Sequence, residues 1–298
     1  MAVYVNTNVS SLNGRRYLNN VQNSLTTTYQ RLSSGMRINS AKDDAAGLQI
    51  ADRLTTQING LNQGNRNTND GIALSQTIEG ALDETTSMLQ KIRTLAVQAA
   101  NGTNTESDRG ALSTEANSLR EEISRIASNT KYGGVSVLDG AYANSIYGAA
   151  ANDKSKGGTL SLQIGANKGD EISFSVNTMK FSAIAGRVNA AGDGYDQGKL
   201  VLSTAAGAKA VIDVMDKMIA DVDKQRSGLG ALQNRLESSI RNQSNVSANQ
   251  ADARSRIRDA DFAEESAALS QQSIIQQAAT SMLMQANSRP QLALSMLG

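Results

Sequence analysis

The chain has 298 residues, and its 29 basic and 28 acidic side chains nearly cancel, so no net field favours nucleic acid or an anionic membrane as a partner. It contains no Cys, no His, no Trp and a single proline, Pro290. The missing residue types exclude a disulfide framework, a thiolate zinc site and the commonest general base, and they disfavour catalysis without excluding it.

The N-terminal residues lack the basic region and apolar stretch of a cleavable secretory signal. No apolar run approaches the ~20 residues needed to cross a bilayer. We therefore expect no membrane insertion, and a chain that is either cytosolic or exported by a route that needs no such signal.

Residues 1–40 are predicted to form a capped helix that carries a thin apolar stripe. Ser33–Gly35 favours an end to this helix, because Gly terminates helices at little cost. The surrounding Asn, Gln, Ser and Thr leave the stripe too polar for a self-sufficient core, so it is predicted to pack between subunits. The stripe residues are Leu18, Val21, Leu25 and Leu32.

Three further helices carry apolar residues at alternating spacings of four and three. They are predicted at Ala45–Ala100, at Ser107–Asn129 after a turn at 101–105, and from Ala205 to about Gln250. This spacing places the apolar side chains on one stripe of each helix, which packs against partner helices. The predicted core seam consists of Ile78, Leu82, Leu89, Ile92, Leu119, Ile123, Met218, Val222, Leu229, Leu232 and Leu236.

The segment between these helices changes from a helical period to a period of two. Leu160–Ile164 and Ile172–Val176 alternate apolar and polar residues on either side of a Gly- and Asn-containing turn, which predicts a β-hairpin. Val135–Val137 is a candidate for a further strand. Residues 140–158, rich in Ala, Asn and Gly, are predicted to form an exposed loop.

A last helix is predicted from about Asp259 to Asn287, followed by Pro290 and an apolar tail. A tail of this kind needs a partner surface, so its residues are also predicted to pack between subunits. The tail residues are Leu292, Leu294, Met296 and Leu297.

Long helices at both ends of the chain predict that the N- and C-terminal segments pair. The expected fold is mainly α, an elongated rod with a coiled-coil-like bundle of terminal helices and a small β-hairpin region in the middle. We expect an inner domain of residues 1–40 and 258–298, a helical core domain of 41–132 and 205–257, and a small β and loop region at 133–204.

Five segments, in order at the two ends of the chain, resemble the terminal regions of the bacterial flagellins. The segments are residues 6–12, 32–48, 89–98, 253–262 and 276–287. The resemblance implies an extracellular structural subunit that polymerises into the flagellar filament for motility. It also implies unfolded export by the type III flagellar route, with an export chaperone, a filament cap and hook-junction proteins as further partners. The short middle implies that the large outer domains of long flagellins are absent. No enzyme activity, cofactor or metal is expected.

The resemblance also places a face for the vertebrate innate flagellin receptor on the helix at residues 89–98 and on the next helix. The family's central arginine is Lys91 here, which keeps the charge but loses the bidentate fork. The same polar face could instead make subunit contacts in the filament. The matching residues are Gln90, Lys91, Arg93, Leu95, Gln98 and Glu115.

Two alternatives stay open: a hook–filament junction protein, which resembles flagellin at both ends, and a generic coiled-coil scaffold. The adjacent acids Asp43–Asp44, Glu121–Glu122 and Glu264–Glu265 favour solvated faces or salt bridges between subunits over catalysis. The basic cluster at 254–258 is diluted by acids and lacks aromatic neighbours, so salt bridges to a neighbouring subunit are favoured over phosphate contacts.

Overall fold

The computed structural model describes residues 7–140, 146–147, 157–190, 194–196 and 198–295, with side chains in the last helix described through residue 288. The chain divides into two compact units. The first unit combines Met1–Ile58 with Ser247–Gly298, and the second is Asn59–Val246. The fold is mainly α with small antiparallel strand pairs in the middle, which confirms the predicted fold class.

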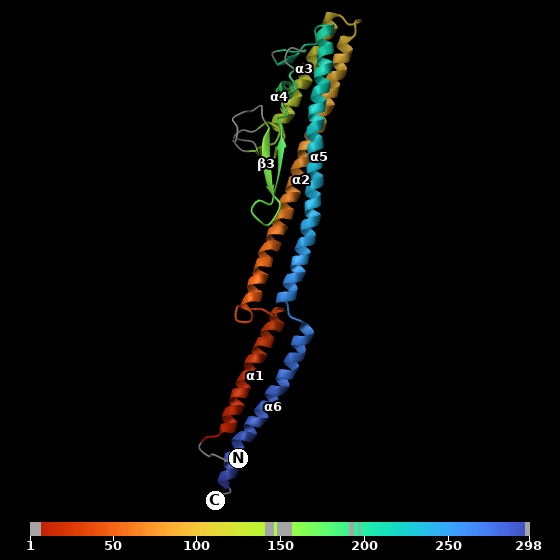
Figure 1. Cartoon of the computed structure of the whole chain (residues 1–298). Helices are drawn as coiled ribbons and strands as arrows, with labels where there is room; N and C mark the ends of the chain where they lie inside the picture. The colour runs from red at the N-terminus through yellow and green to blue at the C-terminus, as the bar shows by residue number, and fades with distance from the viewer. Residues whose placement is uncertain (1–6, 141–145, 148–156, 191–193, 197, 296–298) are drawn as a thin grey trace. The chain divides into compact units, whose positions relative to one another are not determined.

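The first unit is built on α1 (Val9–Ser34) and α6 (Phe262–Ser295), which lie side by side (Figure 1). The side chain of Asn8 caps α1 by accepting a hydrogen bond from the Ser11 amide. At the other end Gly35 adopts a left-handed conformation with φ of 69°, which glycine reaches without steric cost. The predicted helix end at Ser33–Gly35 is therefore confirmed.

The segments that follow α1 and precede α6 are joined by backbone hydrogen bonds. The amides of Arg37 and Ile38 both donate to the carbonyl of Arg258, at 2.7 and 3.3 Å. The amide of Ala260 donates to the carbonyl of Gly35 at 3.0 Å. These bonds satisfy polar groups that the two breaks in helix would leave unpaired.

The second unit contains parts of α2 (Ala45–Ala100) and α5 (Ala205–Arg258) and the whole of α3 (Glu106–Asn129). The predicted turn at 101–105 is present. Thr105 opens α3 with a capping box, in which its hydroxyl accepts from the amide of Asp108 and the Asp108 carboxylate accepts from the amide of Thr105.

Helices α2 and α5 run antiparallel along an apolar seam. Arg93 on α2 donates two hydrogen bonds to Asp216 on α5, at 2.6 and 3.2 Å. Further along, Arg226 on α5 pairs with Asp83 on α2 at 3.0 Å. Surface ion pairs of this kind contribute little to stability, so the apolar seam carries most of the packing energy and the ion pairs follow its register.

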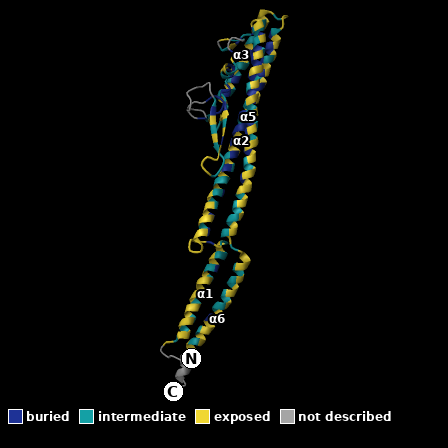
Figure 2. Ribbon diagram, viewed as in Figure 1, coloured by how far each residue is buried: buried dark blue, intermediate teal, exposed yellow. Residues whose placement is uncertain are grey.

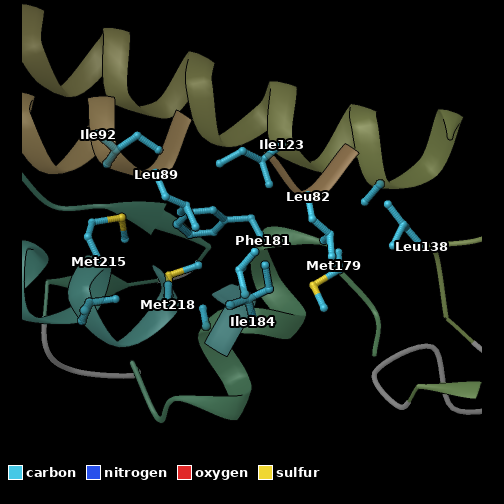
Figure 3. Packing of buried hydrophobic residues seen from close by; sticks show 14 of the residues in the cluster. Leu82, Leu89, Ile92, Ile123, Leu138, Met179, Phe181, Ile184, Met215 and Met218 are labelled. Atoms are coloured by element: carbon cyan, nitrogen blue, oxygen red, sulfur yellow. The ribbon is translucent and has the colours of Figure 1, made fainter. Parts of the chain in front are cut away.

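Phe181 lies at the centre of the core, among side chains from three long helices (Figure 3). It opens α4 (Phe181–Arg187), a helix too short for a periodic pattern to predict. Arg187 links α4 to α5 by two hydrogen bonds to Asp221, at 2.6 and 3.0 Å. It also donates to the Thr178 carbonyl, which precedes α4, at 2.7 Å.

The structure buries all but one of the predicted core-seam residues. Leu119 is the exception and is half-buried, because α3 turns Ala116, Ile123 and Ala127 toward the other helices and Leu119 lies at the edge of that stripe. The buried residues are Ile78, Leu82, Leu89, Ile92, Ile123, Met218, Val222, Leu229, Leu232 and Leu236.

The predicted hairpin is present as β3 (Gly158–Gln163) and β4 (Glu171–Val176), an antiparallel pair in which Leu162 lies opposite Ile172. Two shorter pairs accompany it. One joins β1 (Lys131–Tyr132) to β2 (Val135–Ser136), and the other joins β5 (Tyr195–Asp196) to β6 (Lys199–Leu200).

Three glycines of α2 let the hairpin lie directly on this helix. A Cβ added to Gly64 would overlap the carbonyl oxygen of Ile164, and one added to Gly71 would overlap the side chain of Leu162. A Cβ on Gly60 would lie 2.6 Å from the Cβ of Ala166 in the turn of the hairpin. The spacing of 60, 64 and 71 places all three on one face of the helix, so this face accepts the hairpin backbone.

The prediction of an exposed loop at 140–158 is wrong at Tyr147. The Tyr147 side chain is buried, its hydroxyl donates to the Val137 carbonyl at 2.8 Å, and the amide of Ile146 donates to the Ser136 carbonyl. Residues 141–145 and 148–156 lie outside the described residues. Burial of a large aromatic side chain is favourable, so Tyr147 is buried although the residues around it are typical of an exposed loop.

Burial raises the pKa of Tyr147 well above its usual range. Its neutral form then stabilises the fold fully below the unfolded pKa of about 10, and this contribution is lost as the pH rises beyond that value. Tyr147→Phe should cost about 1 kcal/mol at neutral pH through the lost hydrogen bond and should flatten the alkaline loss of stability. Urea unfolding of both proteins between neutral and alkaline pH tests this, and equal alkaline slopes would contradict it.

Candidate functional site

The interface between α1 and α6 buries few side chains, in contrast to the second unit (Figure 2). Among the described side chains of the two helices, Val21, Thr28 and Ala279 are the buried ones. Leu18, Leu25 and Leu32 of the predicted stripe are half-buried. Where the stripe is buried, it is covered by α6 of the same chain, and the pair alone leaves much of its apolar surface unburied.

Polar contacts fix the antiparallel register of this pair. Arg31 pairs with Glu265 at 3.0 Å near one end, and Thr28 donates to the side chain of Gln272 at 3.3 Å. Near the other end Gly14 lies against Leu283, where an added Cβ would be 3.1 Å from Cδ1 of Leu283. The small glycine permits this close helix approach.

The prediction that the last helix ends near Asn287 is wrong, because α6 continues through Pro290 to Ser295. A proline within a helix leaves the carbonyl four residues earlier without its donor, here that of Ala286. The amide Nδ2 of Asn8 donates to this carbonyl at 2.8 Å. Asn8 therefore caps α1 with its oxygen and supports α6 with its nitrogen, a pairing that the sequence alone could not predict.

A groove follows the α1–α6 pair and is lined on one side by Asn13 and Tyr17 and on the other by Ile275 and Met282. The α6 side of the pair also carries strongly exposed apolar residues. Ile274 is 66% exposed and Met282 70%, while Tyr17 on α1 is 56% exposed. Large apolar side chains gathered on one helix pair are typical of a surface that another protein covers.

Sequence reasoning named the apolar stripe of α1 but not the exposed apolar residues of α6. Ile275 and Met282, which both line the groove, are seven residues apart, close to two helical turns, so this spacing was the available signal. Of the predicted tail residues, Leu292 and Leu294 lie in the helical backbone of α6 and their side chains are outside the described part of the chain. Met296 and Leu297 lie outside it altogether.

The predicted receptor face lies on α2 and α3, and one of its members does not belong to the surface. Leu95 is buried in the core, so it supports the face from below and offers no side chain to a partner. Lys91 and Glu115 pair across the two helices at 3.1 Å and stay exposed. Gln90 and Gln98 are also exposed.

Arg93, the remaining member of that face, is held by Asp216 of α5. The bidentate contact with Asp216 raises the pKa of the guanidinium. Arg93 therefore remains charged and oriented along the α2–α5 interface, with part of its side chain accessible.

The paired acids are used within the chain. Asp43 accepts hydrogen bonds from the amides of Ser40 and Asn39, which lower the pKa of its carboxyl. Glu122 pairs with Arg125 at 2.5 Å, a contact that lowers the pKa of Glu122.

Basic residues at the end of α5 are likewise engaged in the chain. Arg256 pairs with Asp252 one turn earlier, at 3.0 Å, and Arg254 donates to the hydroxyl of Thr55 at 3.4 Å. These two arginines therefore have contacts inside the first unit, and the bridges to a neighbouring subunit stay a prediction.

Among the described residues, no group of three or more Asp, Glu, His or Cys could hold a metal ion. The helices described by the structure include none long and apolar enough to span a bilayer.

Comparison with known proteins gives two family matches that flank the middle of the chain. The bacterial flagellin N-terminal helical region matches residues 5–143, and the bacterial flagellin C-terminal helical region matches residues 212–297. Together they cover more than half of the sequence. The chain belongs to the bacterial flagellin family.

Two full-length relatives agree with this assignment. Flagellin B of Vibrio cholerae serotype O1 is 36% identical over 376 aligned positions, and polar flagellin F of Vibrio parahaemolyticus is 37% identical over 377. Both alignments cover 100% of each chain. Each alignment has more positions than the 298 residues of this flagellin, so the relatives carry residues that this chain lacks.

Two solved structures are also similar. Bacillus cereus flagellin has 26% identity and a TM-score of 0.44, covering 60% of this chain and 88% of its own. A Vibrio parahaemolyticus structure described as a flagellar hook-associated protein has 19% identity and a TM-score of 0.56, covering 73% of this chain and all of its own; this likeness concerns the fold alone.

Flagellins are structural proteins of the bacterial flagellar filament, an extracellular assembly, and the family is not one of enzymes.

Proposed function

We propose that this flagellin polymerises with copies of itself into the helical flagellar filament, and that α1 and α6 provide its innermost subunit contacts. The observation that supports this is the set of strongly exposed large apolar side chains on the pair, which includes Tyr17, Ile274 and Met282. Burial of a large apolar side chain contributes roughly 1.5–3 kcal/mol as an upper estimate, before the cost of ordering is subtracted.

We also propose that the chain has the three parts expected from its sequence. Residues 1–40 and 258–298 form the inner layer, and 41–132 with 205–257 form the shell around it. Residues 133–204 project outward as a small β region, without the large outer domains of longer flagellins. The alignment positions that this chain lacks are in keeping with that absence.

Assembly outside the cell requires export, and we propose the type III flagellar route with an export chaperone that shields the terminal apolar residues. A filament cap and hook-junction proteins complete the set of partners. A hook–filament junction protein is the second candidate function, and the hook-associated structure shares only the fold with this chain. The 36% identity to flagellins over the whole chain favours the filament subunit over the junction protein and over a generic scaffold.

The exposed residues Gln90, Lys91, Gln98 and Glu115, with Arg93, form the proposed face for an innate flagellin receptor. The Lys91–Glu115 pair links α2 to α3 on this face, so a receptor would have to accommodate or break it. Because the face is polar and exposed, it also suits contacts between subunits.

Deletion of Arg289–Gly298 tests the assembly proposal. The second unit has its own core, so its thermal unfolding should stay near that of the intact chain, while the critical concentration for polymerisation should rise sharply. Calorimetry and seeded sedimentation, with electron microscopy of the pellets, measure both effects.

A finer comparison keeps the chain length. Leu292→Ser with Leu294→Ser should raise the critical concentration, whereas the matched control, Gln291→Ser with Ser295→Ala, should leave it nearly unchanged. If the truncated and substituted chains polymerise as readily as the intact chain, the tail is not an assembly surface. If the intact chain forms only discrete particles, the filament proposal itself fails.

A further inference from the structure

The chain contains three Asn–Gly pairs, and one of them lies outside a helix. Asn13–Gly14 lies inside α1 and Asn59–Gly60 inside α2, whereas Asn101–Gly102 lies in the corner between α2 and α3. A glycine offers its backbone nitrogen to the preceding asparagine side chain with no Cβ in the way.

Attack of that nitrogen on the asparagine amide requires a backbone rotation that a helix opposes. Regular helix holds ψ near −42° and engages the glycine N–H in a bond to the carbonyl four residues earlier. Asn13 and Asn59 are held in this way. Asn101 follows the last residue of α2 and is free of this restraint.

The local contacts at Asn101 favour the reaction. Its side chain is exposed, and its Oδ1 accepts a hydrogen bond from the amide of Thr103 at 3.5 Å, which closes a turn around Gly102. The same contact withdraws electron density from the amide carbonyl. A Cβ built on Gly102 meets no atom within 4 Å, so the approach is open.

We propose that Asn101–Gly102 is a site of spontaneous covalent self-modification with water as the only co-reactant. The Gly102 nitrogen forms a bond to Cγ of Asn101, and the Cγ–Nδ2 bond breaks. Nδ2 leaves as ammonia and takes up the proton that the Gly102 nitrogen loses, so a five-membered imide remains. Water then opens the imide, and the Gly102 nitrogen regains a proton.

Opening at Cγ gives aspartate, and opening at the backbone carbonyl carbon gives isoaspartate. In isoaspartate the chain runs through the former side chain, and the former backbone carbonyl of Asn101 becomes a free carboxylate. The net change replaces the amide of Asn101 by a carboxylate and releases ammonia, with no oxidant or reductant.

Arg109 is placed to favour the isoaspartyl product. Its Nη1 donates to the carbonyl of Asn101 at 3.3 Å and to that of Ala99 at 3.4 Å. Its Nε is buried and has no hydrogen-bond partner within the described part of the chain. Because hydrogen bonds to a charged acceptor are stronger than those to a neutral carbonyl, the guanidinium holds the new carboxylate more firmly than the original carbonyl. Arg109 is thus a positioning residue for the modification.

The product changes the corner where α2 passes into α3. It inserts one methylene group into the backbone and adds a negative charge at the C-terminal end of α2, where the helix dipole disfavours anions. Arg109 offsets that charge. The modification is independent of polymerisation and marks how long a folded chain has existed.

The test incubates the full-length protein in mildly alkaline buffer made with heavy-oxygen water, followed by peptide mapping with fragmentation that separates aspartyl from isoaspartyl products. We expect Asn101 to convert at least about tenfold faster than Asn59, because conversion in the helix requires prior local opening. Each converted residue should carry one heavy oxygen atom. Gly102→Ala, at a position with free space, should slow conversion of Asn101 by about tenfold or more while thermal unfolding stays the same.

Arg109→Gln should lower the ratio of isoaspartyl to aspartyl product at Asn101, and Arg109→Lys, which keeps the charge without the planar fork, should retain most of it. Equal conversion at Asn101 and Asn59, or conversion unaffected by Gly102→Ala, would overturn the site. A product ratio that both Arg109 variants leave unchanged would overturn the role given to Arg109.

Discussion

Gly64→Ala is expected to destabilise the chain and release the β3–β4 hairpin from α2, whereas Gly80→Ala in the same helix is expected to stabilise it. The added methyl group at position 64 would overlap the carbonyl oxygen of Ile164, a backbone atom that cannot move without the strand. Overpacking of this kind typically costs about 1–3 kcal/mol. At Gly80 an added Cβ meets nothing within 4 Å, so the helix should gain about 0.4–1 kcal/mol.

The two glycine variants are compared by urea unfolding and by amide exchange of the hairpin. The amide of Ile164 donates to the Asp170 carbonyl at 2.9 Å. Its exchange rate should rise in Gly64→Ala and should stay the same in Gly80→Ala. Stability shifts of the same sign in both variants would contradict the close contact between hairpin and helix.

The second large effect is expected at Leu89. Its side chain is fully buried beside Phe181, so Leu89→Ala removes apolar contacts and leaves a cavity in the core (Figure 3). Such truncations cost about 2–5 kcal/mol. The neighbouring Gln90 is exposed, and Gln90→Ala should change stability by less than about 0.5 kcal/mol. Thermal unfolding of both variants measures the difference, and comparable losses would mean that the seam is not the core.

The helices and their buried faces could be predicted because a repeat of apolar residues survives in the sequence. The buried seam residues, from Ile78 to Leu236, follow that repeat, so the helical period alone was enough to predict that they are buried. The repeat misplaced Leu119 because the exposure of an edge position depends on which partner helices are present. Leu95 was placed on the surface by resemblance, although its helical position turns it into the core.

Features that depend on tertiary contacts were not predictable. Helix α6 passes through Pro290 because Asn8, distant in sequence, supplies the missing donor. The glycines at 60, 64 and 71 could be seen in the sequence, but their role depends on a hairpin some hundred residues away. Tyr147 was assigned to a loop by composition and is held in the core by Val137. Short-range pattern carries no information about such pairings.

Helices α1 and α6 are expected to gain their order from packing between subunits, and amide exchange of the monomer and of the polymer measures this. With Val21, Thr28 and Ala279 as the buried side chains of the described pair, α1 and α6 should exchange rapidly in the isolated chain, while the α2–α5 seam stays protected. After seeded polymerisation the two helices should become as protected as the seam. Strong protection of α1 and α6 in a monodisperse monomer, unchanged on polymerisation, would show that the pair is ordered without contacts between subunits.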